Sequence, residues 1–153
     1  MPTQLSDTIF LERRRRRTRN LIAALAAAAA VVSGAAFAEQ QCSTPSGPMR
    51  SRILDAVRAP VAIDLGAPIE FKVERARQCG PFVFVLATPQ RPGGAEIHWK
   101  GTPCEGDTSH LVGALLRRKG DLWTLVNYAL CPADVAWVDW PEKYKAPAIL
   151  FEE

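Results

Sequence analysis

Four cysteines constrain the fold of this chain more than any other feature of its sequence. Cys42, Cys79, Cys104 and Cys131 follow one another at intervals of 37, 25 and 27 residues. Zinc sites usually use close pairs such as C-x-x-C, which the chain lacks, so the spacing favours disulfides over a metal site and no cofactor is expected. Because disulfides persist in oxidising compartments, the cysteines also bear on where the chain folds.

The N-terminal segment predicts export. RRRRRTR at residues 13–19 precedes an apolar, alanine-rich stretch at 21–35, and Ala36-Phe37-Ala38 follows it. This order is typical of a signal peptide, so residues 1–38 are predicted to be removed after Ala38. A permanent membrane anchor is the alternative, since residues 21–38 reach the lower length for a bilayer span. The A-x-A ending favours cleavage, periplasmic or secreted localisation, and membrane contact only before cleavage.

Positive charge is confined to the predicted signal peptide. The whole chain has a formal net charge of +3, but residues 39–153 carry 13 basic and 14 acidic side chains. A nucleic-acid-binding domain normally carries an excess of basic residues on its folded part. We therefore expect no nucleic-acid partner, and we expect residues 39–153 to form a single domain.

Residues 48–65 are predicted to form an amphipathic helix. Six apolar side chains recur at helical spacing with charged residues between them: Met49, Ile53, Leu54, Val57, Val61 and Leu65. Pro48 suits the first helical turn, and Gly66 suits the residue after the helix. Pro60 lies inside, removes a backbone hydrogen bond and should kink or break the helix.

The rest of the domain is predicted to be an antiparallel meander. Residues 69–74 alternate between apolar and charged, and 82–87 are wholly apolar, with a turn at residues 78–81. Residues 111–118 and 122–130 form a second predicted hairpin. A long loop at 88–110 is expected to contain a short strand at Ile97 to Lys100, and the tail from Cys131 onwards to pack back over the sheet. The predicted fold is α+β, with the kinked helix packed on a four-stranded sheet.

This layout selects one of the three possible cysteine pairings. The helix delivers the chain to the start of the first strand, so Cys42 should lie at the opposite end, beside the turn that holds Cys79. Cys131 closes the fourth strand at the end where the third strand begins, which is where the loop carrying Cys104 arrives. The prediction is Cys42–Cys79 and Cys104–Cys131, each stabilising the fold by roughly 3.5 to 4 kcal/mol.

Several segments resemble a known group of sequences. They are RSRILDAVRAPVAIDLGAPIEF (50–71), FVFVLATPQRPGG (82–94), ALLRRKGDLWTLVNYAL (114–130) and DVAWVDWPEKYKAP (134–147). They look like a family of small uncharacterised exported bacterial proteins, a resemblance that implies no particular activity, catalytic residue or ligand. The order of helix and strands also resembles cystatin-like and NTF2-like proteins, which implies a general architecture and no site.

The tail holds the densest group of candidate binding residues: Trp137, Trp140 and Tyr144 with Asp134 and Asp139. Aromatic faces and carboxylates together could bind a sugar or peptide, and the two carboxylates could act as an acid/base pair. The alternative, which we favour, is that the aromatic side chains cover the open face of the sheet.

Two further groups are weaker candidates. His98, Glu105, Asp107 and His110 lie in or beside one loop, but their spacing matches no metal-ligand pattern. Arg117-Arg118-Lys119 makes a basic hairpin tip that could contact anionic lipid, lipopolysaccharide or peptidoglycan, or could simply keep the hairpin soluble.

No catalytic residue is assigned, because nucleophile-elbow, phosphate-loop and dinucleotide motifs are absent from the sequence. The sequence favours an exported, disulfide-stabilised, non-catalytic binding or interaction domain of the bacterial cell envelope, with an envelope protein or small ligand as its partner. A small NTF2-like ligand-pocket protein or hydrolase is the alternative, and a cystatin-like protease inhibitor is a third class.

Overall fold

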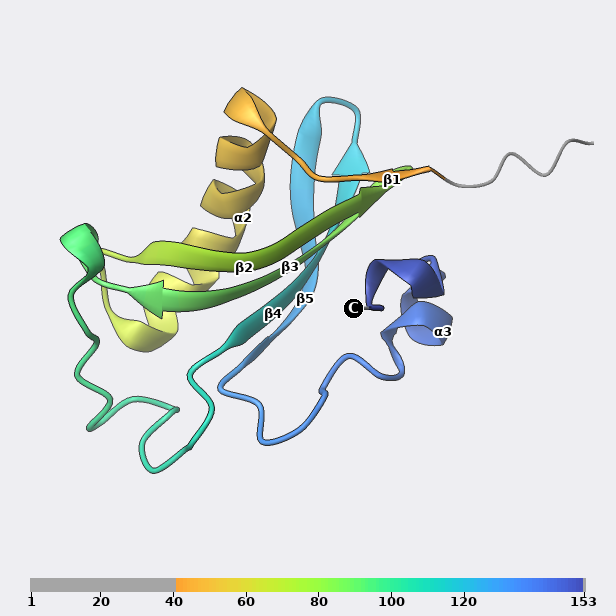
Figure 1. Ribbon diagram of the computed structural model, residues 1–153. Coiled ribbons are helices and arrows are strands. Elements are labelled where there is room, and N and C mark those ends of the chain that lie inside the picture. The colour runs from red at the N-terminus through yellow and green to blue at the C-terminus, as the bar shows by residue number, and fades with distance from the viewer. Residues whose placement is uncertain (1–40, 153) are drawn as a thin grey trace, which may run out of the picture. The chain divides into compact units, whose positions relative to one another are not determined.

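An antiparallel sheet packs between one long helix and a C-terminal segment in the computed structural model, which describes residues 41–152 (Figure 1). The strands are β1 (Cys42–Ser43), β2 (Glu70–Cys79), β3 (Phe82–Gln90), β4 (Val112–Lys119) and β5 (Leu122–Leu130). The helices are α2 (Gly47–Leu65) and α3 (Trp140–Tyr144), with short 3₁₀ turns η1 (Pro92–Gly94) and η2 (Ala148–Leu150). The predicted α+β class is confirmed.

The long helix α2 buries one face against the sheet. Ile53, Val57, Val61 and Leu65 recur every four residues and are all buried. The helical conformation continues through Pro60, so of the two expected effects, a kink or a break, the helix does not show a break. Burial of Val57 and Val61 on either side of the proline holds this stretch against the core and offsets the lost hydrogen bond.

The end of α2 is capped by a side chain from a distant part of the sequence. Arg91, which follows β3, donates from Nη2 to the carbonyl of Leu65 at 2.8 Å and from Nη1 to the carbonyl of Pro68 at 3.0 Å. Its Nη1 also bonds the carbonyl of Gly66. The last carbonyls of a helix have no partner within the helix, so Arg91 fixes the helix end to the sheet.

The strands follow the sequential order β1-β2-β3-β4-β5, with every neighbouring pair antiparallel. The meander is as predicted, but the sheet has five strands and not four. The additional strand β1 pairs Cys42 with Cys79 and Ser43 with Gln78. Two residues are too few to show an alternating pattern, which is why the sequence analysis missed this strand.

Both hairpins turn on a glycine. Gly80 connects β2 to β3 with a φ of 58°, and Gly120 connects β4 to β5 with a φ of 60°. A positive φ at the first central residue of a two-residue loop matches the type II′ turn, which follows the twist of the strands and needs glycine there. These turns fix the register of both hairpins.

The predicted disulfides, Cys42–Cys79 and Cys104–Cys131, are both present. The first joins two paired strands, and the second joins the loop before β4 to the end of β5. The strand predicted at Ile97 to Lys100 is wrong: β3 continues to Gln90, and residues 97–100 pair with no strand. Because β3 and β4 already pair with strands on both sides, neither has an edge to offer this segment, which is anchored by the buried Ile97.

A bulge in β2 divides its side chains between the two faces of the sheet. Val73 pairs with Ala87 and Arg75 with the adjacent Leu86, so Glu74 is left out of the β2–β3 register. An extra residue reverses the alternation of side chains. Val73 and Ala76 therefore both contact the core beneath α2, while Arg75 is directed to the opposite face.

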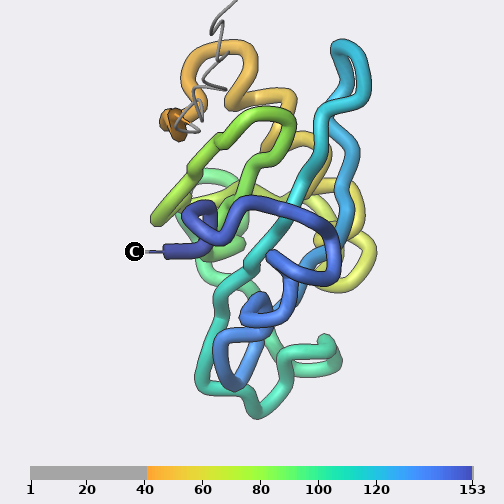
Figure 2. Tube along the Cα trace, turned by 90° about the vertical axis from the view of Figure 1, so that its right-hand side faces the viewer, coloured from red at the N-terminus to blue at the C-terminus, as the bar shows by residue number. Residues whose placement is uncertain are grey.

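The C-terminal segment covers that opposite face, as predicted for the tail. In Figure 2 the blue segment lies across the front of the strands, with α2 behind them. Its buried residues Trp137, Trp140 and Leu150 pack with Phe84 of β3 and Leu115 of β4. Arg75 and Arg77 also hold it, the first by a bond to the carbonyl of Phe151 and the second to that of Ile149.

Candidate functional site

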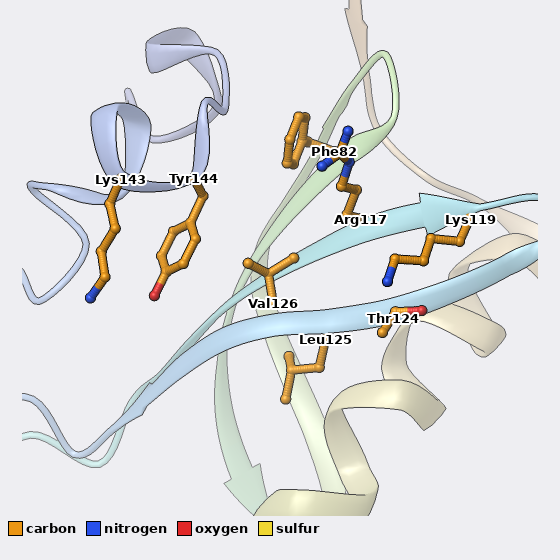
Figure 3. A pocket seen from close by; sticks show the side chains of 8 residues that line it. All are labelled: Phe82, Arg117, Lys119, Thr124, Leu125, Val126, Lys143 and Tyr144. Atoms are coloured by element: carbon orange, nitrogen blue, oxygen red, sulfur yellow. The ribbon is translucent and has the colours of Figure 1, made fainter.

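A groove of about 390 Å³ lies between the β4–β5 hairpin and α3 (Figure 3). We call it the basic groove; its lining residues are Phe82, Arg117, Lys119, Thr124, Leu125, Val126, Lys143 and Tyr144. Three of these eight side chains are cationic and none is a carboxylate or a histidine. The groove therefore has the electrostatic character of an anion site.

Sheet register explains why one wall of the groove contains these residues. Phe82 pairs with Arg117 across β3 and β4, and Arg117 pairs with Thr124 across β4 and β5. Directly paired residues share a face of a sheet, so the three side chains form a row. Lys119 lies two residues beyond Arg117 and shares its face, whereas Arg118 between them points to the other side.

The other wall comes from α3 and the floor from β5. Figure 3 shows Lys143 and Tyr144 on one side, Phe82 and Arg117 on the other, and Val126 between them. Val126 has no partner in the β4–β5 ladder, because Leu115 pairs with Asn127 and the adjacent Leu116 with Leu125. A second bulge thus places an apolar side chain on the floor of the groove.

Aromatic rings, not carboxylates, accompany two of the cations. The guanidinium carbon of Arg117 is 5.3 Å from the ring centre of Phe82, and Nζ of Lys143 is 5.3 Å from that of Tyr144. The one ion pair found within residues 41–152 joins Arg58 to Asp55 on α2. Cation–π contacts orient a cation without cancelling its charge, so the positive potential of the groove is preserved.

The five candidate residues of the tail have different surroundings in the structure. Trp137 and Trp140 are only 8% and 3% exposed, and their rings pack against Phe84 at centroid distances of 5.1 and 6.3 Å. They cover the sheet, the role favoured above. Asp134 and Asp139 are exposed and do not line the basic groove; Tyr144 is half-buried and does line it.

The structure also shows where three of the four loop candidates lie. His110 stacks on Trp99 at a centroid distance of 4.0 Å, and the carboxylate of Glu105 accepts a hydrogen bond from the amide of Gly101. Asp107 lies near the sulfur atoms of Cys104 and Cys131, all three ligand atoms falling within 4.8 Å of one another. Since those two cysteines form a disulfide, their sulfurs are not available as thiolate ligands.

One polar contact on the helix side of the sheet escaped the sequence analysis. The hydroxyl of Tyr128 on β5 donates to Oδ2 of Asp64 on α2 at 2.6 Å. This hydrogen bond, with burial and the negative charge of Asp64, raises the pKa of Tyr128 to about 12. The pair joins the helix to the edge of the sheet and lies outside the basic groove.

The sequence indicated part of the groove. The basic hairpin tip named above includes Arg117 and Lys119, and Tyr144 was a candidate in the tail. Phe82, Thr124, Val126 and Lys143 were missed, because their inclusion depends on strand register and on where the tail returns to the sheet. Alternation along β4 alone could have separated Arg118 from its two neighbours.

Comparisons with known proteins do not name a family: no family model, curated protein or solved structure matches this chain.

Proposed function

We propose that this chain is an exported, non-catalytic binding domain of the bacterial cell envelope, periplasmic or secreted, and that it holds an anionic envelope component in the basic groove. One observation carries the proposal: three cationic side chains from β4 and α3 line one groove with an apolar floor, and no carboxylate is among the lining residues. An anionic partner supplies the negative charge that the lining of the groove lacks.

One further feature supports export. The two disulfides indicate an oxidising environment outside the cytoplasm. Within residues 41–152, no helix is long and apolar enough to cross a membrane. The signal-peptide prediction concerns residues 1–38, which lie outside the described range.

Binding is favoured over catalysis by the chemistry of the groove. Its hydroxyl groups, on Thr124 and Tyr144, have neither a histidine nor a carboxylate beside them in the lining to act as a base. For the ligand-pocket alternative, the relevant region is the space between α2 and the sheet. That space is occupied by a buried apolar cluster that includes Val57, Val85 and Leu116.

Export is tested by expressing the full chain in a bacterial host and fractionating the cells. We expect the protein outside the cytoplasm, with a mass that corresponds to cleavage after Ala38 and no thiol that reacts before reduction. Full-length protein with four reactive thiols in the cytoplasm would contradict the proposal.

Binding is tested by sedimenting the purified, oxidised protein with the insoluble envelope fraction. A double variant, Arg117→Gln with Lys143→Gln, removes two groove cations and should weaken co-sedimentation by about tenfold or more. Arg118→Gln with Lys72→Gln is the matched control, because it removes the same charge from exposed residues outside the groove. Equal loss in both variants would show that the groove is not the binding site.

A further inference from the structure

The charge of the basic groove narrows the class of its anionic ligand; this inference rests on the function proposed above. Arg117, Lys119 and Lys143 place three positive charges around one groove. A single carboxylate supplies one negative charge and two oxygens, which leaves most of this charge unmatched. A phosphomonoester carries about −1.5 to −2 charges at neutral pH on three acceptor oxygens.

The hydrogen-bond donors fit the same group. The guanidinium of Arg117 presents a planar fork of donors that matches phosphate geometry, and the two lysines act as mobile point charges. Thr124 and Tyr144 add hydroxyl donors from β5 and α3. Arg117 and Lys119 share one face of β4, so both can bind the same phosphate, while Lys143 adds positive charge from the opposite wall of the groove (Figure 3).

The volume and floor of the groove call for more than a phosphate ion. About 390 Å³ lies within the range of small-molecule sites, and a phosphate group alone fills only part of it. Phe82, Val126 and Tyr144 provide the apolar surface beneath and beside the cations (Figure 3). An apolar portion of the ligand gains free energy by covering this surface.

We infer that the basic groove binds a phosphomonoester attached to an apolar body, with the phosphate on Arg117 and Lys119 and the body on Phe82, Val126 and Tyr144. Such a group occurs on soluble metabolites and on lipid headgroups. The exposed Leu122, which pairs with Lys119 at the hairpin tip, lies where a lipid surface would meet the groove.

The experiment measures affinities of the purified, oxidised protein by calorimetry at fixed ionic strength. Four soluble probes separate the contributions: hexyl phosphate, hexanoate, inorganic phosphate and hexanol. Hexyl phosphate should bind about tenfold or more tightly than each of the other three, because it alone combines a divalent phosphate with an apolar chain. Hexanoate binding as tightly as hexyl phosphate would overturn the inference.

Variants test whether the probe binds in the basic groove. Arg117→Gln and Lys119→Gln should each weaken hexyl phosphate binding by about fivefold or more, whereas Arg118→Gln should leave it within about twofold. Circular dichroism verifies that each variant is folded. Equal effects of Arg117→Gln and Arg118→Gln would overturn the inference, since Arg118 does not line the groove.

Vesicles of phosphatidylcholine with phosphatidic acid distinguish the two sources of the phosphate. Binding that depends on Arg117 indicates a lipid headgroup, and hexyl phosphate binding without vesicle binding indicates a soluble ligand; both support the inference. If no probe binds while co-sedimentation with the envelope still requires Arg117, the phosphomonoester is wrong and the proposed function stands. If neither binding is seen, both fall.

Discussion

A single missing side chain allows the C-terminal segment to lie close to the sheet. At Gly113 of β4, a Cβ atom would lie 2.5 Å from both Cε3 and Cζ3 of Trp137. No real Cβ contact is that short, so the indole ring occupies the space that any other residue would fill. Glycine within a strand is typical of such close approaches, although the sequence does not reveal which side chain approaches.

Gly113→Ala should therefore destabilise the fold by displacing Trp137. We expect the free energy of unfolding in urea to fall by about 1 to 3 kcal/mol, the usual cost of overpacking. The matched measurement repeats the change in a Trp137→Leu background, where the clash with the indole is absent and the cost should be smaller. The same cost in both backgrounds would show that the ring is not the obstacle.

The Tyr128–Asp64 hydrogen bond predicts a dependence on alkaline pH. The pKa of Tyr128 is raised from 10.0 to about 12 in the folded chain, so folding favours the protonated phenol. Its contribution to stability is complete below pH 10 and is lost as the pH rises through about 12.

Ultraviolet titration of tyrosinate tests this shift. The chain has two tyrosines, so Tyr144→Phe leaves Tyr128 as the single tyrosine reporter. We expect its midpoint near pH 12 and a return toward 10 when Asp64→Asn removes the negative charge. A midpoint near 10 with Asp64 intact would contradict the hydrogen bond.

At the scale of elements, the sequence predicted the helix and strands that have a repeating pattern of apolar residues. It did not predict the features that lack such a pattern. The periodicities of 48–65 and 69–74 identified α2 and the start of β2, and the glycine turns defined both hairpins. The two-residue strand β1 and the bulges at Glu74 and Val126 carry no such pattern. These irregular features decide which side chains share a face, and so they determine the groove.

The capping of α2 by Arg91 gives a prediction at this scale. Arg91→Met keeps the length of the side chain but removes the donors to the carbonyls of Leu65, Gly66 and Pro68. Because the carbonyl of Leu65 ends α2 and the other two lie just beyond it, we expect the free energy of unfolding to fall by about 1 to 2 kcal/mol. Arg118→Met, at an exposed position whose side chain caps no element, should change it by less than about 0.5 kcal/mol. Similar values for the two variants would rule out the capping role.

At the scale of the whole domain, a different part of the chain covers each face of the sheet. The space between α2 and the sheet is filled by the larger apolar cluster, and the C-terminal segment covers the second face with its tryptophans. The C-terminal segment includes α3, which places Lys143 and Tyr144 across the basic groove from the row of side chains that contains Arg117. The disulfide pairing could be predicted from the order of the helix and strands alone. The groove depends on where the tail packs against the sheet, which the sequence did not predict.

The location of a bound anion tests the central claim most directly. Amide signals of the isotopically labelled, oxidised protein can be followed by nuclear magnetic resonance while hexyl phosphate is added. We predict that the largest shifts fall together on Phe82, Arg117, Thr124, Val126 and Lys143, which line the basic groove. Shifts that concentrate elsewhere, such as around the exposed Ile63 of α2, would contradict the assignment of this groove as the binding site.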